Sequence, residues 1–573
     1  YPFERQRYWL ERQMAGGKTP TDQGMEISVL CWRQIPVTMP AIPQGVIGFL
    51  GKEGADVAEA LRQRGWNALL FKTIADLEGS SVLPDTLVDC RFAGQGGNSL
   101  ASAAHTCGEA AELCAWLAEC ANGQAMSVYW LTSGAAAFGT ALPIIDRSAL
   151  LAPARVLPFE ARNTLACVLD VEEGLSAPVL ADLLGKAVSN RMAATALTSL
   201  VAVRAGIFWQ EQPECVQQSE NIKEHIHLRE GAVYLVFCFF FGIGRTFMLD
   251  LARQAAEQQR RITLVPLQKT RRSAEFWENC ASEWAIVRPR YVDLNNQDEL
   301  MQVLDEVLAE HKDVAGIVHA SGVTGGGLMQ AQSMAVDKTE NWSAKVIPLL
   351  GIEKVMQFCN VDFVIFNTSI GALCGSVGQL DNTVANIVLD TWAMRQQRAG
   401  TRVMGIRWDV WRQVGVINKV ASLHARLSGE ELKGGITPDA ALAAVKACVG
   451  TMVELPVVSG RSLASMLEEA RTKRGLATDA LESADLKAEG SVGQRPPLMV
   501  EWRGARHALD RALADLFESR LGLSGIGIDD DYVELGGDSL MAMPLAKEIR
   551  DLFDLSAFSV AQIFRQRTVA NIA

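Results

Sequence analysis

The clearest fold signal in this chain is the stretch AVYLVFCFFFGIG, residues 232–244. Its apolar run from Val233 to Gly244 is roughly half as long as a helix that crosses a bilayer, so we interpret it as a buried strand. Two glycines, Gly242 and Gly244, close the run. The stretch opens a series of strand-like and helix-like segments that continues to about residue 470, and such a series predicts a parallel, Rossmann-like sheet.

A similar alternation precedes this stretch, from about residue 25 to residue 230. The strand candidates of the two series are residues 46–50, 67–71, 127–132, 165–170, 232–236, 262–265, 316–320 and 363–366. Short apolar runs separated by helix-like segments favour parallel strands. Because the first series has no glycine-rich phosphate loop, we expect it to be a scaffold. The expected fold is α/β with two Rossmann-like subdomains, the first truncated and structural and the second of the catalytic type.

The composition is that of a globular protein, with 573 residues, 49% hydrophobic residues and 21% charged residues. The formal net charge of -12 argues against nucleic acid as a partner. No apolar run is long enough for a membrane, and the 12 cysteines lack paired spacing, so we expect reduced thiols in a cytoplasm. With 7 histidines and no HExxH pattern, we expect no catalytic metal.

Near the C-terminus the chain reads YVELGGDSL, residues 532–540. Gly536 and Gly537 allow a tight turn, Asp538 can cap the following helix, and Ser539 stands at the start of that helix. The helix N-terminus would favour a phosphodiester on this serine. The alternative is a chance loop-to-helix transition in which Ser539 is only a cap, and the acidic run at residues 529–531 argues against it.

This motif resembles the attachment site of an acyl or peptidyl carrier domain. The resemblance implies that Ser539 carries 4′-phosphopantetheine, added by a phosphopantetheinyl transferase, which holds a growing chain as a thioester. The opening YPFERQRYWL, residues 1–10, resembles the linker that follows the acyltransferase domain in modular type I polyketide synthases; an ordinary amphipathic lead-in is the alternative. The implied partners are the ketosynthase and acyltransferase domains of the same module and a downstream module.

Residues 232 to 416 resemble the catalytic subdomain of a polyketide synthase ketoreductase, a relative of the short-chain dehydrogenases/reductases. The first series is similar to the structural subdomain of the same enzymes. The features that carry the resemblance are Gly242 and Gly244 of the glycine loop, Asp293 at the adenine position, HASGV at residues 319–323, and the tryptophans Trp408 and Trp411. The resemblance implies a site for NADPH, which the residues of the loop then put in doubt.

The cofactor loop departs from the family pattern. Phe237, Cys238 and the run Phe239–Phe241 occupy the places of the family's Thr-Gly-Gly and of the two residues after it. Bulky side chains would fill the space that a dinucleotide needs and would disfavour positive φ angles. Lys269 stands where the family usually has an arginine for the 2′-phosphate, but one lysine does not offset a blocked loop. We therefore expect NADPH not to bind.

The catalytic positions depart as well. Lys345, Ser369 and Asn386 match the family's lysine, serine and asparagine, but Asn382 stands where the family has its tyrosine. Reduction needs a hydroxyl that donates a proton to the developing alkoxide, and an amide has no titratable proton near neutral pH. Residues 324–326, Thr-Gly-Gly, likewise replace the family's Leu-Asp-Asp motif. We expect these residues to be vestigial and the reductase-like part to be inactive.

The resulting hypothesis is a fragment of a polyketide synthase, or of a hybrid polyketide/nonribosomal peptide line, whose pseudo-reductase leaves the β-keto group unreduced. An active NADPH-dependent β-ketoacyl reductase with a divergent site is the main alternative; epimerisation without net reduction and a docking surface for a partner are two others. The expected domains are a linker at 1–24, the structural subdomain at 25–230, the catalytic-type subdomain at 231–470, a linker at 471–504, and a four-helix, C-terminally truncated carrier domain at 505–573.

Overall fold

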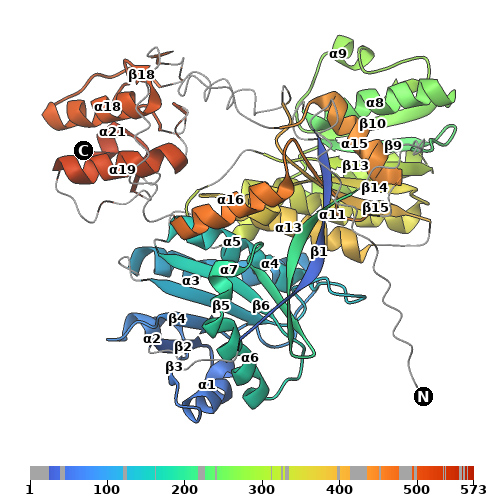
Figure 1. The fold of residues 1–573 in the computed structure, drawn as a ribbon. Helices are drawn as coiled ribbons and strands as arrows, with labels where there is room; N and C mark the ends of the chain where they lie inside the picture. Colours follow the sequence, from blue (N-terminus) through green and yellow to red (C-terminus); the bar gives the residue numbers. More distant parts are fainter. Residues whose placement is uncertain are drawn as a thin grey trace, which may run out of the picture.

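The computed structural model of this chain (Figure 1) describes most of its residues. The described residues are 25–38, 45–120, 125–161, 163–216, 226–238, 242–311, 313–323, 327–329, 335–396, 400–412, 414, 435–450, 453–476, 493–495, 498, 500–532, 534–535, 537, 539–553, 558, 562–563 and 566–573. The linker expected at residues 1–24, the run Phe239–Phe241 and the motif position 324–326 lie outside the described residues.

One sheet of 16 strands runs through both of the expected Rossmann-like units. Its order is β11-β10-β9-β13-β14-β15-β16-β1-β8-β7-β6-β5-β4-β2-β3, and β12 pairs with β10. The strands are β1 Glu26–Ile35, β2 Val46–Leu50, β3 Asn67–Phe71, β4 Thr86–Asp89, β5 Met126–Thr132, β6 Thr164–Asp170, β7 Leu200–Arg204, β8 Ile207–Cys215, β9 Val233–Cys238, β10 Ile262–Gln268, β11 Ala285–Val287, β12 Arg290–Tyr291, β13 Val314–Ala320, β14 Phe363–Ser369, β15 Arg402–Trp408 and β16 Val457–Ser459.

The second half of this body, from β9 to β16, is a parallel sheet with β9 near its centre. All six residues of β9 are buried, as expected for a central parallel strand with helices on both faces. The order on either side of β9 is that of a dinucleotide-binding fold. Its helices are α8 Ile243–Gln258, α9 Ala274–Glu278, α10 Gln297–Glu310, α11 Glu340–Phe358, α12 Gly371–Cys374, α13 Leu380–Arg395, α15 Pro438–Gly450 and α16 Leu463–Leu476.

The first half, from β2 to β7, is also parallel, in the order β3-β2-β4-β5-β6-β7. This is the order of flavodoxin-like sheets. Its helices are α1 Ala55–Arg62, α2 Ile74–Glu78, α3 Leu100–Cys120, α4 Ile145–Ala149, α5 Leu151–Glu160, α6 Ala177–Ser189 and α7 Met192–Thr195. The two halves confirm the expected α/β fold with two Rossmann-like subdomains.

Two antiparallel strands join the halves into one sheet. Residues Glu26 to Ser28 at the start of β1 pair with β16 of the second half, and the rest of β1 pairs along its length with β8. Strand β8 in turn pairs with β7 of the first half. In Figure 1 the blue strand β1 accordingly runs from the second half toward the first. The first described strand of the chain is therefore the seam of the whole sheet.

Helix α13 closes the same seam on one face of the sheet. It belongs to the second half, and it packs against α4 and α5 of the first half as well as against β14 and β15. Thirteen of its residues, from Leu380 to Ala393, are buried, which is typical of a helix surrounded by protein on all sides. At its end, Arg395 donates from Nη1 to the carbonyl of Pro143 across the halves at 2.9 Å.

A separate helical unit, residues 493–573, follows. Its described elements are β17 Gly493–Gln494, α18 Ala508–Leu521, β18 Leu523–Ser524, α19 Ser539–Phe553 and α21 Val569–Ile572. Helices α18 and α19 pack together around a small core that includes Phe517, Tyr532 and Leu545. The rings of Phe517 and Tyr532 meet edge to face with their centroids 5.5 Å apart. Both side chains are fully buried, so this pair anchors the loop before α19 to α18.

The elements cross two of the expected boundaries. Helix α16 continues to Leu476, past the boundary expected at residue 470. Its Arg474 is buried and donates to the carbonyl of Leu197 in the first half. This charged residue of a polar segment is therefore part of a buried contact between the two halves. Within the linker expected at 471–504, Gln494 pairs with Ser524, and Arg495 forms a bidentate ion pair with the buried Asp530. These residues pack as part of the helical unit.

Candidate functional site

Three elements of the second half bring the expected catalytic residues to one place. Lys345 lies on α11, Ser369 is the last residue of β14, and Asn382 and Asn386 lie one turn apart on α13. Strand β14 ends at the carboxyl edge of the sheet, where open α/β sheets hold their ligands. The position of these residues is therefore fixed by buried secondary structure and not by loops.

A chain of hydrogen bonds links three of these side chains. Lys345 Nζ donates to Asn386 Oδ1 at 3.0 Å. Asn386 Nδ2 donates to Asn382 Oδ1 at 3.0 Å and to the Asn382 carbonyl at 2.8 Å. Asn382 Nδ2 then donates to Gln379 Oε1 at 3.3 Å. The side chain in the tyrosine position is therefore hydrogen-bonded to other amides at both of its polar atoms.

Lys345 and His319 are buried at this hydrogen-bond network, and burial shifts the pKa of each side chain. Burial lowers the pKa of Lys345 to about 8, although the charge of Asp390 acts in the opposite direction. Burial, and then the charge of Lys345, lowers the pKa of His319 to about 3. His319 Nε2 lies 3.0 Å from Ser321 Oγ. The site therefore holds a neutral imidazole and an amine that titrates near physiological pH.

Ser369 and Asn382 both face a cavity of about 360 Å³. Ser369 Oγ accepts a hydrogen bond from the amide of Gly371 at 3.1 Å. The wall opposite the sheet comes from α16 and the turn before it, with Arg461 and Lys473 both paired to Glu469. The cavity is large enough for a small acyl group and has polar groups at one end. Among the residues that the structure describes, no tyrosine lines it, and the lining residues are Phe159, Ser369, Ile370, Gly371, Cys374, Gly375, Ser376, Gln379, Asn382, Thr383, Arg461, Met466, Glu469, Ala470 and Lys473.

The cofactor end of the sheet is closely packed among the described residues. Cys238 ends β9, and a Cβ added to Gly244 on α8 would lie 2.7 Å from the Cβ of Cys238. Gly244 therefore serves the close approach of α8 to β9. The cavity lined by Cys238, Gln268 and Trp277 has a volume of about 10 Å³, enough for about one water molecule. Gly242 precedes α8, and buried Phe237 packs beside His319 with ring centroids 6.3 Å apart.

The two residues expected to face the adenosine part of a dinucleotide contact each other. Lys269 Nζ lies 2.6 Å from Asp293 Oδ2, and the hydrogen bond to this carboxylate raises the pKa of Lys269. Asp293 also accepts from the amide of Asn295 through Oδ1 at 3.1 Å. Lys269 is largely exposed, so this is a surface pair of small energetic value.

The two tryptophans of the resemblance are core residues. Trp408 and Trp411 are almost fully buried and meet edge to face, with ring centroids 5.0 Å apart. Trp408 Nε1 donates to Asn367 Oδ1 at 2.8 Å, and Asn367 Nδ2 donates to the carbonyl of His319 at 3.0 Å. Trp408 therefore links β15 to β13 through Asn367 of β14, behind the site.

One residue beside the site, Glu160, has no local signal in the sequence. It ends α5 of the first half, and its carboxylate accepts from the amides of Met329 at 2.7 Å and Gly378 at 2.9 Å in the second half. Part of the residue is exposed, but desolvation of the carboxyl group raises its pKa to about 7. Its partners lie 169 and 218 residues away in the sequence, and no local pattern connects them.

Ser539 is the first residue of α19 in the helical unit. The turn before it approaches Tyr532 so closely that a Cβ on Gly537 would lie 2.4 Å from the tyrosine ring. The amide of Gly537 donates to the carbonyl of Tyr532 at 2.8 Å, which tightens the turn. A serine at the start of a 15-residue helix is a suitable place for a phosphodiester.

Metal binding and membrane insertion find no support in the described ranges. Within them, no three His, Cys, Asp or Glu side chains lie together in a way that would hold a metal ion. None of the helices whose residues the structure describes is long and apolar enough to cross a membrane.

Comparison with known families matches both parts of the chain. Residues 232–413 match the KR domain, and residues 511–573 match the phosphopantetheine attachment site. Polyketide synthase PksN of Bacillus subtilis is 24% identical over 194 residues, which are 33% of this chain and 4% of that protein. Phenolphthiocerol synthesis polyketide synthase type I Pks15/1 of Mycobacterium marinum is 24% identical over 309 residues, 50% of this chain and 14% of that protein. The chain thus spans a small part of these relatives.

A solved structure agrees with the fold. The ketoreductase from the first module of phoslactomycin biosynthesis in Streptomyces sp. HK803 matches with a TM-score of 0.58 at 19% identity, covering 78% of this chain and 96% of that one. Together, the fold and the two family matches define a ketoreductase-type domain followed by a phosphopantetheine-attachment domain. These two domain matches and the polyketide synthase relatives support a fragment of a modular polyketide synthase that carries both domains.

Proposed function

We propose that the ketoreductase-type domain is a structural pseudo-reductase and that the carrier domain holds its acyl chain with the β-keto group unreduced. The observation that carries this proposal is Asn382, which occupies the tyrosine position and whose amide is hydrogen-bonded to Asn386 and Gln379. An amide supplies no proton to an alkoxide near neutral pH. Because no phenol is found at this position, we expect Lys345, Ser369 and Asn386 to have structural roles here.

Packing at the cofactor end supports the second part of the proposal, that NADPH does not bind. Cys238 stands in the place of a glycine of the family loop, and its side chain lies so close to α8 that a Cβ on Gly244 would be 2.7 Å from its Cβ. Lys269 is paired with Asp293 and is not held in place for a 2′-phosphate. A dinucleotide loop needs close backbone approach and open space at this point.

The test is a fluorescence titration of the purified chain with NADPH, with an active ketoreductase domain as the positive control. We expect no binding at millimolar NADPH. Micromolar binding would overturn the pseudo-reductase hypothesis and favour the alternative, an NADPH-dependent β-ketoacyl reductase with a divergent site. The Lys345–Asn386 hydrogen bond is the observation that favours this alternative, because it keeps the amine beside the site.

For the carrier domain we propose Ser539 as the attachment site of 4′-phosphopantetheine. When bound, this group supplies a flexible arm that ends in a thiol and forms the thioester. The chain contributes the start of α19, where Ser539 is the first residue, and the tight turn at Gly537 before it. The proposed partners are a phosphopantetheinyl transferase, the ketosynthase and acyltransferase domains of the same module, and a downstream module, all in a cytoplasm.

Mass spectrometry of the intact chain tests this assignment. Incubation with a phosphopantetheinyl transferase and coenzyme A should add one phosphopantetheine to the wild type and none to Ser539→Ala. Ser519→Ala, which removes an exposed hydroxyl on α18 of the same domain, is the matched control and should be modified like the wild type. Modification of Ser539→Ala would show that another residue carries the group.

A further inference from the structure

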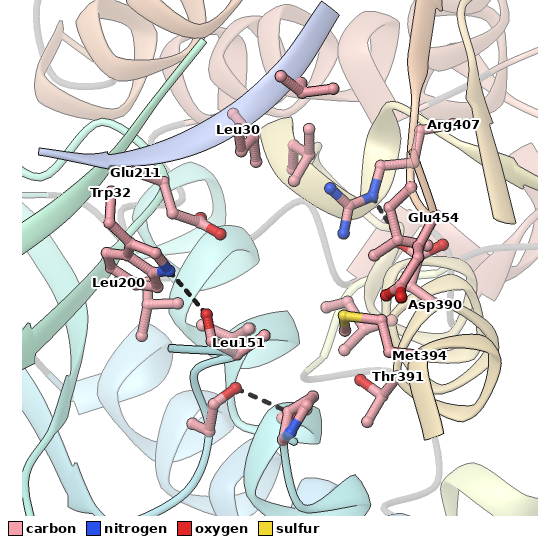
Figure 2. A pocket seen from close by; sticks show the side chains of 18 of the residues that line it. Leu30, Trp32, Leu151, Leu200, Glu211, Asp390, Thr391, Met394, Arg407 and Glu454 are labelled. Carbon is pink, nitrogen blue, oxygen red and sulfur yellow. Dashed lines mark hydrogen bonds and ion pairs between the residues drawn. The ribbon is translucent and has the colours of Figure 1, made fainter. Parts of the chain in front are cut away.

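A second cavity of about 360 Å³ lies where the two halves of the ketoreductase-type domain meet. It shares no lining residue with the cavity at Ser369 and Asn382. Figure 2 shows it between β1 and the helices of the first half on one side and α13 with β15 on the other. Thirteen of its 20 lining residues are apolar, among them Leu30, Leu151 and Met394, and the polar ones are Ser148, Arg155, Glu211, Asp390, Thr391, Arg407 and Glu454. Nothing in the proposed function uses this space.

One wall of this cavity presents an oriented cation. Arg407 Nε donates to Asp390 Oδ2 at 2.7 Å, and Asp390 is almost fully buried on α13. Among the described residues, the two terminal nitrogens of Arg407 have no hydrogen-bond partner, and Figure 2 shows them pointing into the cavity. A guanidinium held by its Nε presents two parallel donors, which match the two oxygens of a carboxylate.

The opposite wall presents an oriented anion. Glu211 on β8 accepts from Thr198 Oγ1 through Oε2 at 2.8 Å, and Oε1 has no partner among the described residues. In Figure 2 the Glu211 carboxylate lies across the cavity from Arg407. The nearby buried Arg155 turns its Nε and Nη1 toward the backbone carbonyls of Thr198 and Ala372. The charge of Arg155 acts on Glu211, and among the described residues Oε1 keeps an acceptor position for the N–H of a protonated amine.

The two ends and the apolar body specify a class of ligand. A lone carboxylate would bind the terminal nitrogens of Arg407 and leave Glu211 Oε1 without a hydrogen bond, and a lone amine would do the reverse. We propose that this cavity binds a small zwitterion, an amino acid with an apolar body, with its carboxylate on Arg407 and its ammonium group on Glu211. The aliphatic lining then covers the carbon skeleton, as in other small-molecule sites.

Isothermal titration calorimetry on the full chain tests the proposal with defined probes. L-leucine and 6-aminohexanoate carry the same two charges at different separations. Hexanoate and hexylamine carry one charge each. We expect one of the two zwitterions to bind at least about tenfold more tightly than both single-charge probes, because each end contributes a charge-assisted hydrogen bond. Two results would overturn the proposal. One is that no probe binds. The other is that leucine does not bind and hexanoate binds as tightly as 6-aminohexanoate.

Variants of the chain assign the site. Arg407→Met and Glu211→Gln should each weaken the zwitterion about tenfold or more. Arg33→Met and Glu214→Gln are matched controls, because this exposed ion pair joins β1 to β8, the strand that carries Glu211, and neither residue lines the cavity. If Arg407→Met fails to fold because it leaves Asp390 buried without its partner, Glu211→Gln decides alone. Unchanged affinity in Glu211→Gln would place the ligand elsewhere and refute the assignment.

Discussion

Lys345 Nζ lies 3.0 Å from Asn386 Oδ1, and this amine has no carboxylate among its described hydrogen-bond partners. Its charge is therefore placed in the protein interior at a cost, next to amides that only partly replace water. In an active reductase of this kind, the same lysine would assist a tyrosine. Here Asn382, whose amide has no titratable proton near neutral pH, takes the place expected for that tyrosine and accepts from Asn386.

The first prediction concerns the return of the phenol. Asn382→Tyr alone should leave the consumption of NADPH with a β-keto thioester at the wild-type background, because the cofactor end stays closely packed around Cys238 and Gly244. The loss of the amide hydrogen bonds should cost about 1 kcal/mol of unfolding free energy. Absorbance of NADPH over time is the measurement. Turnover in this variant would mean that the dinucleotide binds and that only the acid was missing.

The second prediction follows from the buried lysine. Its folded pKa of about 8 lies below the ordinary value of 10.5, so the unfolded state binds more protons between these pH values and the wild type gains stability as pH rises through this window. In Lys345→Met this gain, about 3 kcal/mol, should be absent.

Urea denaturation of the wild type and Lys345→Met at pH 7 and pH 10.5 measures this difference directly. The comparison between the two proteins removes the ionisation of the other side chains, which they share. Lys338→Met is the matched control, because the side chain of Lys338 is 77% exposed. An identical change in unfolding free energy for the wild type and Lys345→Met would contradict the assignment of a buried, uncompensated amine.

The third prediction has the opposite sign. The pKa of Glu160 is raised to about 7 from 4.5, so the folded state holds its proton more tightly, and the wild type gains stability relative to Glu160→Gln as pH falls from 7 toward 4.5. Thermal denaturation at pH 8 and pH 5 is the measurement. Glu78→Gln, an exposed site on α2, should show no such pH-dependent difference from the wild type. A Glu160→Gln difference that is constant with pH would refute the shifted pKa.

The fourth prediction tests the turn before Ser539. Gly537→Ala should destabilise the carrier domain by about 1–3 kcal/mol, because the added methyl group meets the ring of the buried Tyr532. Hydrogen exchange of peptides from α18 and α19 in the full chain reports the stability of this domain. Ser519→Ala should leave their exchange unchanged. Wild-type exchange in Gly537→Ala would show that the turn yields without cost.

Local patterns predicted the features that local physics determines. The buried run at β9 and the eight strand candidates of the two halves followed from apolar spacing, and they are present. Ser539 was expected at the start of a helix and is its first residue. In each case the sequence pattern and the element that it predicts span the same few residues. Composition and spacing were therefore sufficient for the prediction.

Contacts between distant segments could not be predicted in this way. Glu160 reaches amides in the other half, and Arg474 is buried against the first half although its segment has the composition of a linker. The contact between Lys269 and Asp293, which joins two positions expected to face a cofactor, depends on the exact geometry of the strand ends. These relationships arise only when the sheet has brought separate segments together.

The seam strand β1 has a consequence for how this protein can be made and cut. Residues 26–28 pair with residues 457–459, so the ribosome must synthesise most of the domain before this strand finds its second neighbour. Such high contact order slows folding and leaves an unpaired strand edge during synthesis. Exchange of modules by recombination is subject to the same constraint. A crossover at residue 231 would separate β1 from β16, so a transplanted second half needs the N-terminal strand of its own parent.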